Sequence, residues 1–184
     1  MSHTDTAAPI YADGARNNPC RFPMPQRIAV PPGTLIAAQS ERIGGFADTF
    51  VTRVPGQVPL SDYVAAFYTS PIFKAERLIL RLAGHPSTDD DAIAVAQGTK
   101  DSFAIWRDPI RTQTELLMRE ASGATASWFM VEPGSEETTL YFGSHVRPKG
   151  NGSGMPFLFK VLAGFHNVYS HALLSAAARR LRAK

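Results

Sequence analysis

The feature that most limits the fold is a run of strand-like segments between Ser102 and Arg147. The segments are SFAIWRD, TQTELLMRE, TASWFMVE and TTLYFGSHVRP, and their β-branched and aromatic residues favour strands. The connections PIR, ASGA and PGSEE have the length of hairpin loops. Parallel neighbours would instead need crossovers of about a dozen residues. This region therefore predicts a four-stranded antiparallel meander.

A long helix is predicted after the meander, from about Gly154 to Arg182, with a length of ~43 Å at 1.5 Å per residue. Pro156 is compatible with this helix because it lies in the first turn. Apolar residues recur at helical spacing. The stripe consists of Leu158, Val161, Leu162, Phe165, Val168, Tyr169, Ala172, Ala176 and Arg180. We expect it to pack on the concave face of a curved antiparallel sheet, which gives an α+β architecture.

One strand and two short helices are predicted ahead of the meander. Residues Phe46–Val54 alternate as a half-buried strand. DYVAAFYTS then predicts one short helix, and PIFKAERLILRLAG predicts a second that ends at Gly84. The expected apolar face of the second helix consists of Ile72, Ala75, Leu78, Ile79 and Leu82. The opposite face is mostly charged and consists of Lys74, Glu76, Arg77 and Arg81.

The N-terminal residues 1–33 contain six prolines and predict an extended arm. We expect residues 34–184 to form a single domain. Within this domain, TLIAA at Thr34–Ala38 predicts a short apolar element.

Composition and charge exclude several classes of protein. The chain has 184 residues, of which 44% are apolar and 19% charged, as in one globular domain. The net charge is +3, and four basic residues close to the C-terminus account for the excess: Arg179, Arg180, Arg182 and Lys184. These charges complement the negative end of a helix and do not follow a groove, so nucleic-acid binding is not indicated. Contact of this tail with a membrane surface stays an alternative.

Neither a cofactor nor a metal site is indicated. The single Cys20 excludes an intramolecular disulfide and a multi-cysteine metal cluster. The run Asp89–Asp91 lacks the ligand spacing of a calcium loop, and predicts a solvated loop or a helix N-terminus. The first residues lack the basic start and apolar run of a signal peptide, and no run of 18 apolar residues occurs. We therefore expect a cytoplasmic protein without a membrane span.

Three stretches carry a resemblance to a known family. They are PPGTLIAAQ with GGFADTFVTRVPG, DYVAAFYTSPIFKAERLILRLAG, and FHNVYSHALL. Over about residues 30 to 181, the chain resembles a bacterial domain-of-unknown-function family of the superfamily that contains START lipid-transfer domains, the birch-pollen allergen and polyketide cyclases. The resemblance implies a helix-grip fold, in which a long helix and a curved sheet enclose a cavity for apolar or amphipathic ligands. We predict fewer strands than in the full grip, which favours an open or small cavity.

The two histidines of FHNVYSHALL do not suit a shared metal ion. His166 and His171 are five residues apart, which separates them by about 140° around a helix, whereas helical zinc pairs have spacings of three or four. His166 flanks the apolar stripe. It is either a boundary histidine bonded to a backbone carbonyl or to Asp48, or a polar group that lines the cavity.

Other candidate ligand-binding residues are aromatic or polar side chains of the last helix and the strands. With His166, they are Phe165, Tyr169, Trp106, Arg107, Glu115, Trp128, Tyr141 and His145. Glu115 with Arg107 or His145 would supply an acid/base pair if both side chains pointed inward.

These observations favour a binding protein that holds a small apolar or amphipathic ligand between the C-terminal helix and the sheet. One alternative is a cyclase- or dehydratase-like enzyme that uses a cavity His or Glu. The other is an interaction module that forms a homodimer through a sheet edge or an apolar patch. Fold alone does not separate these alternatives, since one fold supports unrelated functions.

Overall fold

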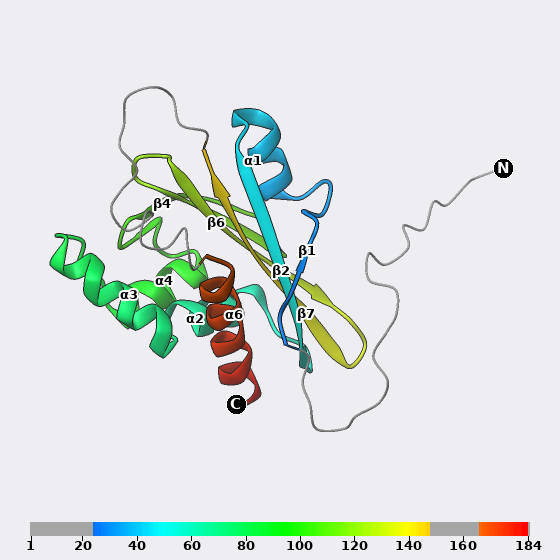
Figure 1. Ribbon diagram of the computed structural model, residues 1–184. Coiled ribbons are helices and arrows are strands. Elements are labelled where there is room, and N and C mark those ends of the chain that lie inside the picture. The colour runs from blue at the N-terminus through cyan, green and yellow to red at the C-terminus, as the bar shows by residue number, and fades with distance from the viewer. Residues whose placement is uncertain (1–23, 148–165, 184) are drawn as a thin grey trace.

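The computed structural model describes residues 24–147 and 166–183. Within these residues, the chain forms a seven-stranded antiparallel sheet in the order β1-β2-β7-β6-β5-β4-β3, with helices on both faces (Figure 1). The strands are β1 (Gln26–Ile28), β2 (Phe46–Pro55), β3 (Ser102–Phe103), β4 (Trp106–Arg111), β5 (Glu115–Glu120), β6 (Thr125–Pro133) and β7 (Glu137–Val146). The described helices are α1 (Leu35–Ile43), α2 (Leu60–Tyr68), α3 (Pro71–Leu82), α4 (Asp89–Gln97) and α6 (His166–Arg182). The predicted α+β class is confirmed.

The meander is present, but its first strand was predicted wrongly. Strands β5, β6 and β7 pair as antiparallel neighbours, as expected. The segment SFAIWRD, however, forms two strands, because the chain reverses at Ala104, whose φ is 51°. The expected connection PIR belongs to β4, where the register shifts between Arg107 and Ile110 and Asp108 has a φ of 50°. This irregularity accommodates Pro109, which has no N–H for the ladder.

The N-terminal region adds a strand and a helix to the sheet. Strand β1, at the end of the predicted arm, pairs with β2, and the expected apolar element at Thr34 begins α1, which Thr34 caps. The sequence therefore predicted fewer strands than the described sheet contains, because strands as short as β1 and β3 show little periodicity.

Helices α2 and α3 follow β2 as predicted, with Pro71 in the first turn of α3 and Ser70 as its cap. The acidic run at Asp89 begins a further helix, α4, so the prediction of a helix N-terminus is confirmed. Thr88 and Asp91 form a capping box there, in which each side chain accepts a hydrogen bond from the other residue's backbone N–H.

The C-terminal helix packs on β2 and α2, but its buried face differs from the predicted stripe. Val168 was placed in the stripe and is 68% exposed, whereas Leu173, Leu174 and Ala177 are buried. The residues of the stripe before His166 lie outside the described residues. The buried face of α6 is rotated relative to the predicted stripe and is wider than one stripe, because α6 contacts both the sheet and α2.

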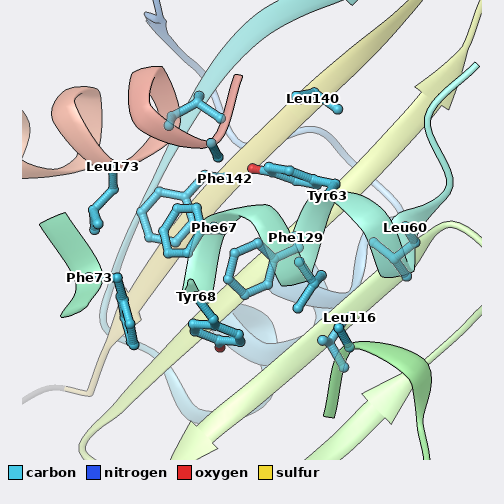
Figure 2. Close-up of a cluster of buried hydrophobic side chains, with 14 of the residues drawn as sticks. Leu60, Tyr63, Phe67, Tyr68, Phe73, Leu116, Phe129, Leu140, Phe142 and Leu173 are labelled. Atoms are coloured by element: carbon cyan, nitrogen blue, oxygen red, sulfur yellow. The ribbon is translucent and has the colours of Figure 1, made fainter. Parts of the chain in front are cut away.

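Two hydrophobic clusters occupy the two faces of the sheet. The larger lies between the sheet and α2, α4 and α6, where Phe67 has its ring centroid 4.8 Å from that of Phe129 and 4.7 Å from that of Phe142 (Figure 2). The smaller lies beneath α1 and includes Leu117 and Trp128. Because successive residues of a strand point to opposite faces, the alternation decides which cluster each strand residue joins.

Candidate functional site

A cavity of about 150 Å³ lies between α2, α3, α6 and the neighbouring strands of the sheet. Its apolar lining includes Phe67, Phe73, Ile105, Trp106, Phe142 and Leu173. Its polar lining includes Glu76, Glu120, Ser127, Ser144, Tyr169 and Ser170. Figure 2 shows part of this wall, where Phe67 and Phe142 lie near Leu173 of α6. The cavity is thus largely apolar, with several aromatic side chains and a few polar groups, which is the usual composition of a small-molecule site.

Glu76 and Tyr169 meet in the wall of this cavity. They lie 93 residues apart in the sequence, on α3 and α6, and the Tyr169 hydroxyl donates a hydrogen bond to Glu76 Oε2. Burial raises the pKa of Glu76 to about 7, although the hydrogen bond from Tyr169 acts in the opposite direction. Burial, followed by the neighbouring Glu76, also raises the pKa of Tyr169 well above its ordinary value. Near neutral pH, Glu76 can therefore either accept or donate a proton.

The orientation of α3 brings Glu76 to the cavity and overturns the predicted faces of this helix. Phe73 and Leu80 are buried, and Glu76 lies between them at helical spacing. Most of the expected apolar face points outward, and Leu82 is 83% exposed, although Ile72 packs against the core. Arg77 anchors this orientation: its guanidinium lies 2.5 Å from Asp89 of α4 and over the ring of Phe103. These contacts stabilise the observed orientation of α3 more than burial of the more numerous apolar residues on its opposite face would.

Trp106 has an unsatisfied donor at the same site. Its side chain lines the cavity and is 8% exposed. Within the part of the chain that the structure describes, its indole Nε1 has no hydrogen-bond partner. Most buried polar groups in proteins do have partners, so this buried N–H is an exception among the described residues.

The structure places the sequence-predicted residues on two faces. Trp106 and Tyr169 line the cavity, whereas Trp128 and Tyr141 belong to the cluster beneath α1. Phe165 lies outside the described residues, as does the side chain of His166. Trp128 and Tyr141 therefore do not line the cavity, because their positions in the strand alternation direct their side chains to the opposite face of the sheet.

The predicted acid/base pair is also separated from the cavity. Glu115 accepts hydrogen bonds from the Leu35 backbone N–H at 2.8 Å and from Trp128 Nε1 at 2.7 Å. It therefore holds the first turn of α1. Arg107 is exposed and pairs with Arg119 across the ladder, on the opposite side of β4 from Trp106. Glu115 and Arg107 do not line the cavity.

His145 and His171 have structural partners. His145 contributes to the cavity wall, but its ring Nε2 lies 2.8 Å from the Gly44 carbonyl at the end of α1, and the residue is 1% exposed. The ring of His171 packs edge-on against Phe50, with the centroids 5.0 Å apart. His171 of α6 therefore contacts strand β2.

Residues 24–147 and 166–183 contain no group of three His, Cys, Asp or Glu side chains arranged to hold a metal ion. Across the same residues, no helix combines the length and apolar character needed to cross a membrane. No protein-family model, curated protein or solved structure matches this chain.

Sequence reasoning missed Glu76, the central polar residue of the cavity. It was assigned to the charged side of an amphipathic helix, as its neighbours suggested. The available signal was its spacing from Phe73 and Leu80, three residues after the first and four before the second, which places it on their face.

Proposed function

We propose that this protein binds a small amphipathic molecule in the cavity between α3, α6 and the sheet, and that its fold is a variant of the helix grip. The observation that carries the proposal is the largely apolar cavity with the hydrogen-bonded Glu76 and Tyr169 side chains in its wall. The packing of the C-terminal helix on an antiparallel sheet supports the helix-grip assignment.

The volume indicates how large a part of a ligand the site can enclose. An apolar cavity of about 150 Å³ binds benzene, whereas pockets for drug-sized ligands measure roughly 300–1,000 Å³. At about 150 Å³, this cavity suits a single ring or a short branched chain bearing one polar group. A lipid with long acyl chains exceeds it.

Benzyl alcohol is a suitable probe, because it combines one ring with one polar hydroxyl and is small enough for the cavity. We expect saturation-transfer NMR to detect its binding to the wild-type chain at millimolar concentration. Leu173→Trp fills the cavity and should abolish the signal, whereas Val168→Trp on the exposed side of the same helix should preserve it. Circular dichroism verifies that both variants fold. Absence of binding to the folded wild type would contradict the proposal.

The Glu76–Tyr169 pair favours a second candidate, an acid/base catalyst. A carboxyl group whose pKa lies near neutrality is suited to moving a proton to and from a bound substrate. Tyr169 would orient the carboxyl, since its hydroxyl donates to Oε2. This candidate keeps the predicted alternative of an enzyme that uses a cavity Glu, with Glu76 in the position considered for Glu115.

Proton exchange tests the catalytic candidate without knowledge of the substrate. Phenylacetone is a one-ring ketone with acidic C–H bonds, and its exchange in D₂O is followed by NMR. Catalysis predicts faster exchange with the wild type than with Glu76→Gln, and a rate that rises as Glu76 ionises. Equal rates for the two proteins would leave binding without catalysis.

A further inference from the structure

We propose that the cavity selects one-ring amphiphiles that carry a positive charge, such as primary amines, over neutral and anionic analogues. This inference rests on the proposed function, since it names the chemical class of the ligand for the same cavity. It follows from the charges and the aromatic side chains that line the site.

The charged residues that line the cavity are acidic. Glu76 enters from α3 and Glu120 from β5, and the described lining includes neither Lys nor Arg. The basic residues near Glu76 on its own helix have a partner, because Lys74 Nζ and Arg77 Nη1 lie 2.6 and 2.5 Å from the carboxylate oxygens of Asp89. A carboxylate ligand would therefore be buried beside like charges with no cation in the described wall.

The aromatic lining also favours a cation. Phe67, Phe73, Trp106 and Phe142 surround the space that Glu76 borders. Ammonium groups are attracted to the faces of aromatic rings, most strongly to Trp. Aromatic rings together with a carboxylate form a common environment for recognising protonated amines, whereas a neutral ligand gains only the burial of its ring.

The hydrogen-bonding capacity of Glu76 is compatible with an ammonium. An ionised carboxylate has about four lone-pair sites, and Tyr169 is the one partner identified for this carboxylate in the described residues. An ammonium would donate to the remaining sites and neutralise the charge.

The titratable and charged groups around Glu76 are Tyr169 on α6, Tyr68 on α2, Glu120 on β5, His145 on β7, whose ring contacts the Gly44 carbonyl, and the Lys74–Asp89–Arg77 cluster between α3 and α4. Burial raises the pKa of Glu76, and the hydrogen bond from Tyr169 lowers it. Because the amine requires the carboxylate form, its affinity should increase between about pH 6 and pH 8, whereas that of a neutral analogue should not.

Three probes of nearly equal size separate charge from shape: benzylamine, benzyl alcohol and benzoate. By isothermal titration at about pH 8, we expect benzylamine to bind about tenfold more tightly than benzyl alcohol, and benzoate to bind most weakly. Glu76→Gln should weaken benzylamine about tenfold and change benzyl alcohol by less than about twofold. Glu132→Gln is the matched control, because Glu132 also accepts a hydrogen bond from a tyrosine, Tyr141, but is exposed and does not line the cavity.

The outcomes separate this inference from the proposed function. Equal affinity for benzylamine and benzyl alcohol, with no effect of Glu76→Gln, would refute charge selection and leave cavity binding standing. An equal loss of benzylamine affinity in Glu132→Gln would assign the effect to net charge and also refute selection by Glu76. Binding of none of the three probes to the folded protein would overturn both proposals.

Discussion

Replacing Glu76 by glutamine should stabilise the protein above neutral pH and change its stability little in mild acid. Burial raises the pKa of Glu76 from its ordinary 4.5 to about 7 in the folded chain. Between these values the unfolded chain loses the proton and the folded chain keeps it, so the free energy of unfolding of the wild type falls as the pH rises. Below about pH 4.5 both states are protonated and the penalty is absent.

The size of the effect follows from the two pKa values. At about 1.36 kcal/mol per pH unit, a rise from 4.5 to about 7 corresponds to ~3 kcal/mol of lost stability above pH 7. Because Glu76 is partly exposed, solvent screening reduces the expected value to ~2 kcal/mol. Glutamine keeps an oxygen that can accept from Tyr169 and has no ionised form. The variant should therefore exceed the wild type by ~2 kcal/mol at pH 8, or roughly 4–8 °C in Tm.

Urea denaturation at a series of pH values, followed by circular dichroism, measures this difference. Glu132→Gln again serves as the control, and as an exposed surface substitution it should change stability by less than about 0.5 kcal/mol. The reasoning is wrong if Glu76→Gln has the same effect at about pH 4.5 and pH 8, or if the variant is less stable than the wild type at the higher pH.

The remaining predictions concern packing and capping, and urea denaturation measures each. Gly143→Ala should lower the free energy of unfolding by ~1–3 kcal/mol, because the added Cβ would lie 2.7 Å from Ile36 Cδ1 and within 3 Å of a backbone oxygen and a tryptophan ring. An unchanged urea midpoint would show that α1 moves away freely. Phe67→Ala removes a ring from the centre of the aromatic cluster and should lower the free energy of unfolding by ~3–5 kcal/mol. Phe46→Ala removes a ring that is 53% exposed and should lower it by less than about 1 kcal/mol. Similar losses in the two variants would contradict the assigned core. Thr88→Ala should lose ~1 kcal/mol through its capping box, and no loss would mean that water replaces the cap.

Much of the secondary structure was predictable because its causes are local. Strand β2, the helices α2 and α3, and the strands β5 to β7 follow from alternation, from Pro71, and from short connections whose length allows only antiparallel pairing. The first meander segment failed because a reversal at Ala104 and an irregularity at Asp108 depend on backbone conformations with positive φ that side-chain patterns do not reveal.

The candidate site was predictable only in part. Trp106 and Tyr169 were identified as candidates and line the cavity, but nothing local distinguished Trp106 from Trp128, which lies on the other face. The register decides this, since a shift of one residue exchanges the faces of a strand.

Helix α3 shows the same limit for a helix. Periodicity correctly predicted two faces, but not which one the protein buries. The face with fewer apolar residues is buried, because Phe73 and Leu80 pack into the aromatic cluster while Arg77 binds Asp89.

By itself, then, the sequence determined an antiparallel α+β domain whose elements begin and end at recognisable caps, prolines and turns. Those signals act over a few residues and need no knowledge of distant partners. Only the tertiary structure decided that Glu76 would meet Tyr169, 93 residues further along, in an aromatic cavity. The proton affinity of Glu76 depends on its burial, which is a property of the packed elements around it and not of its neighbours in the chain.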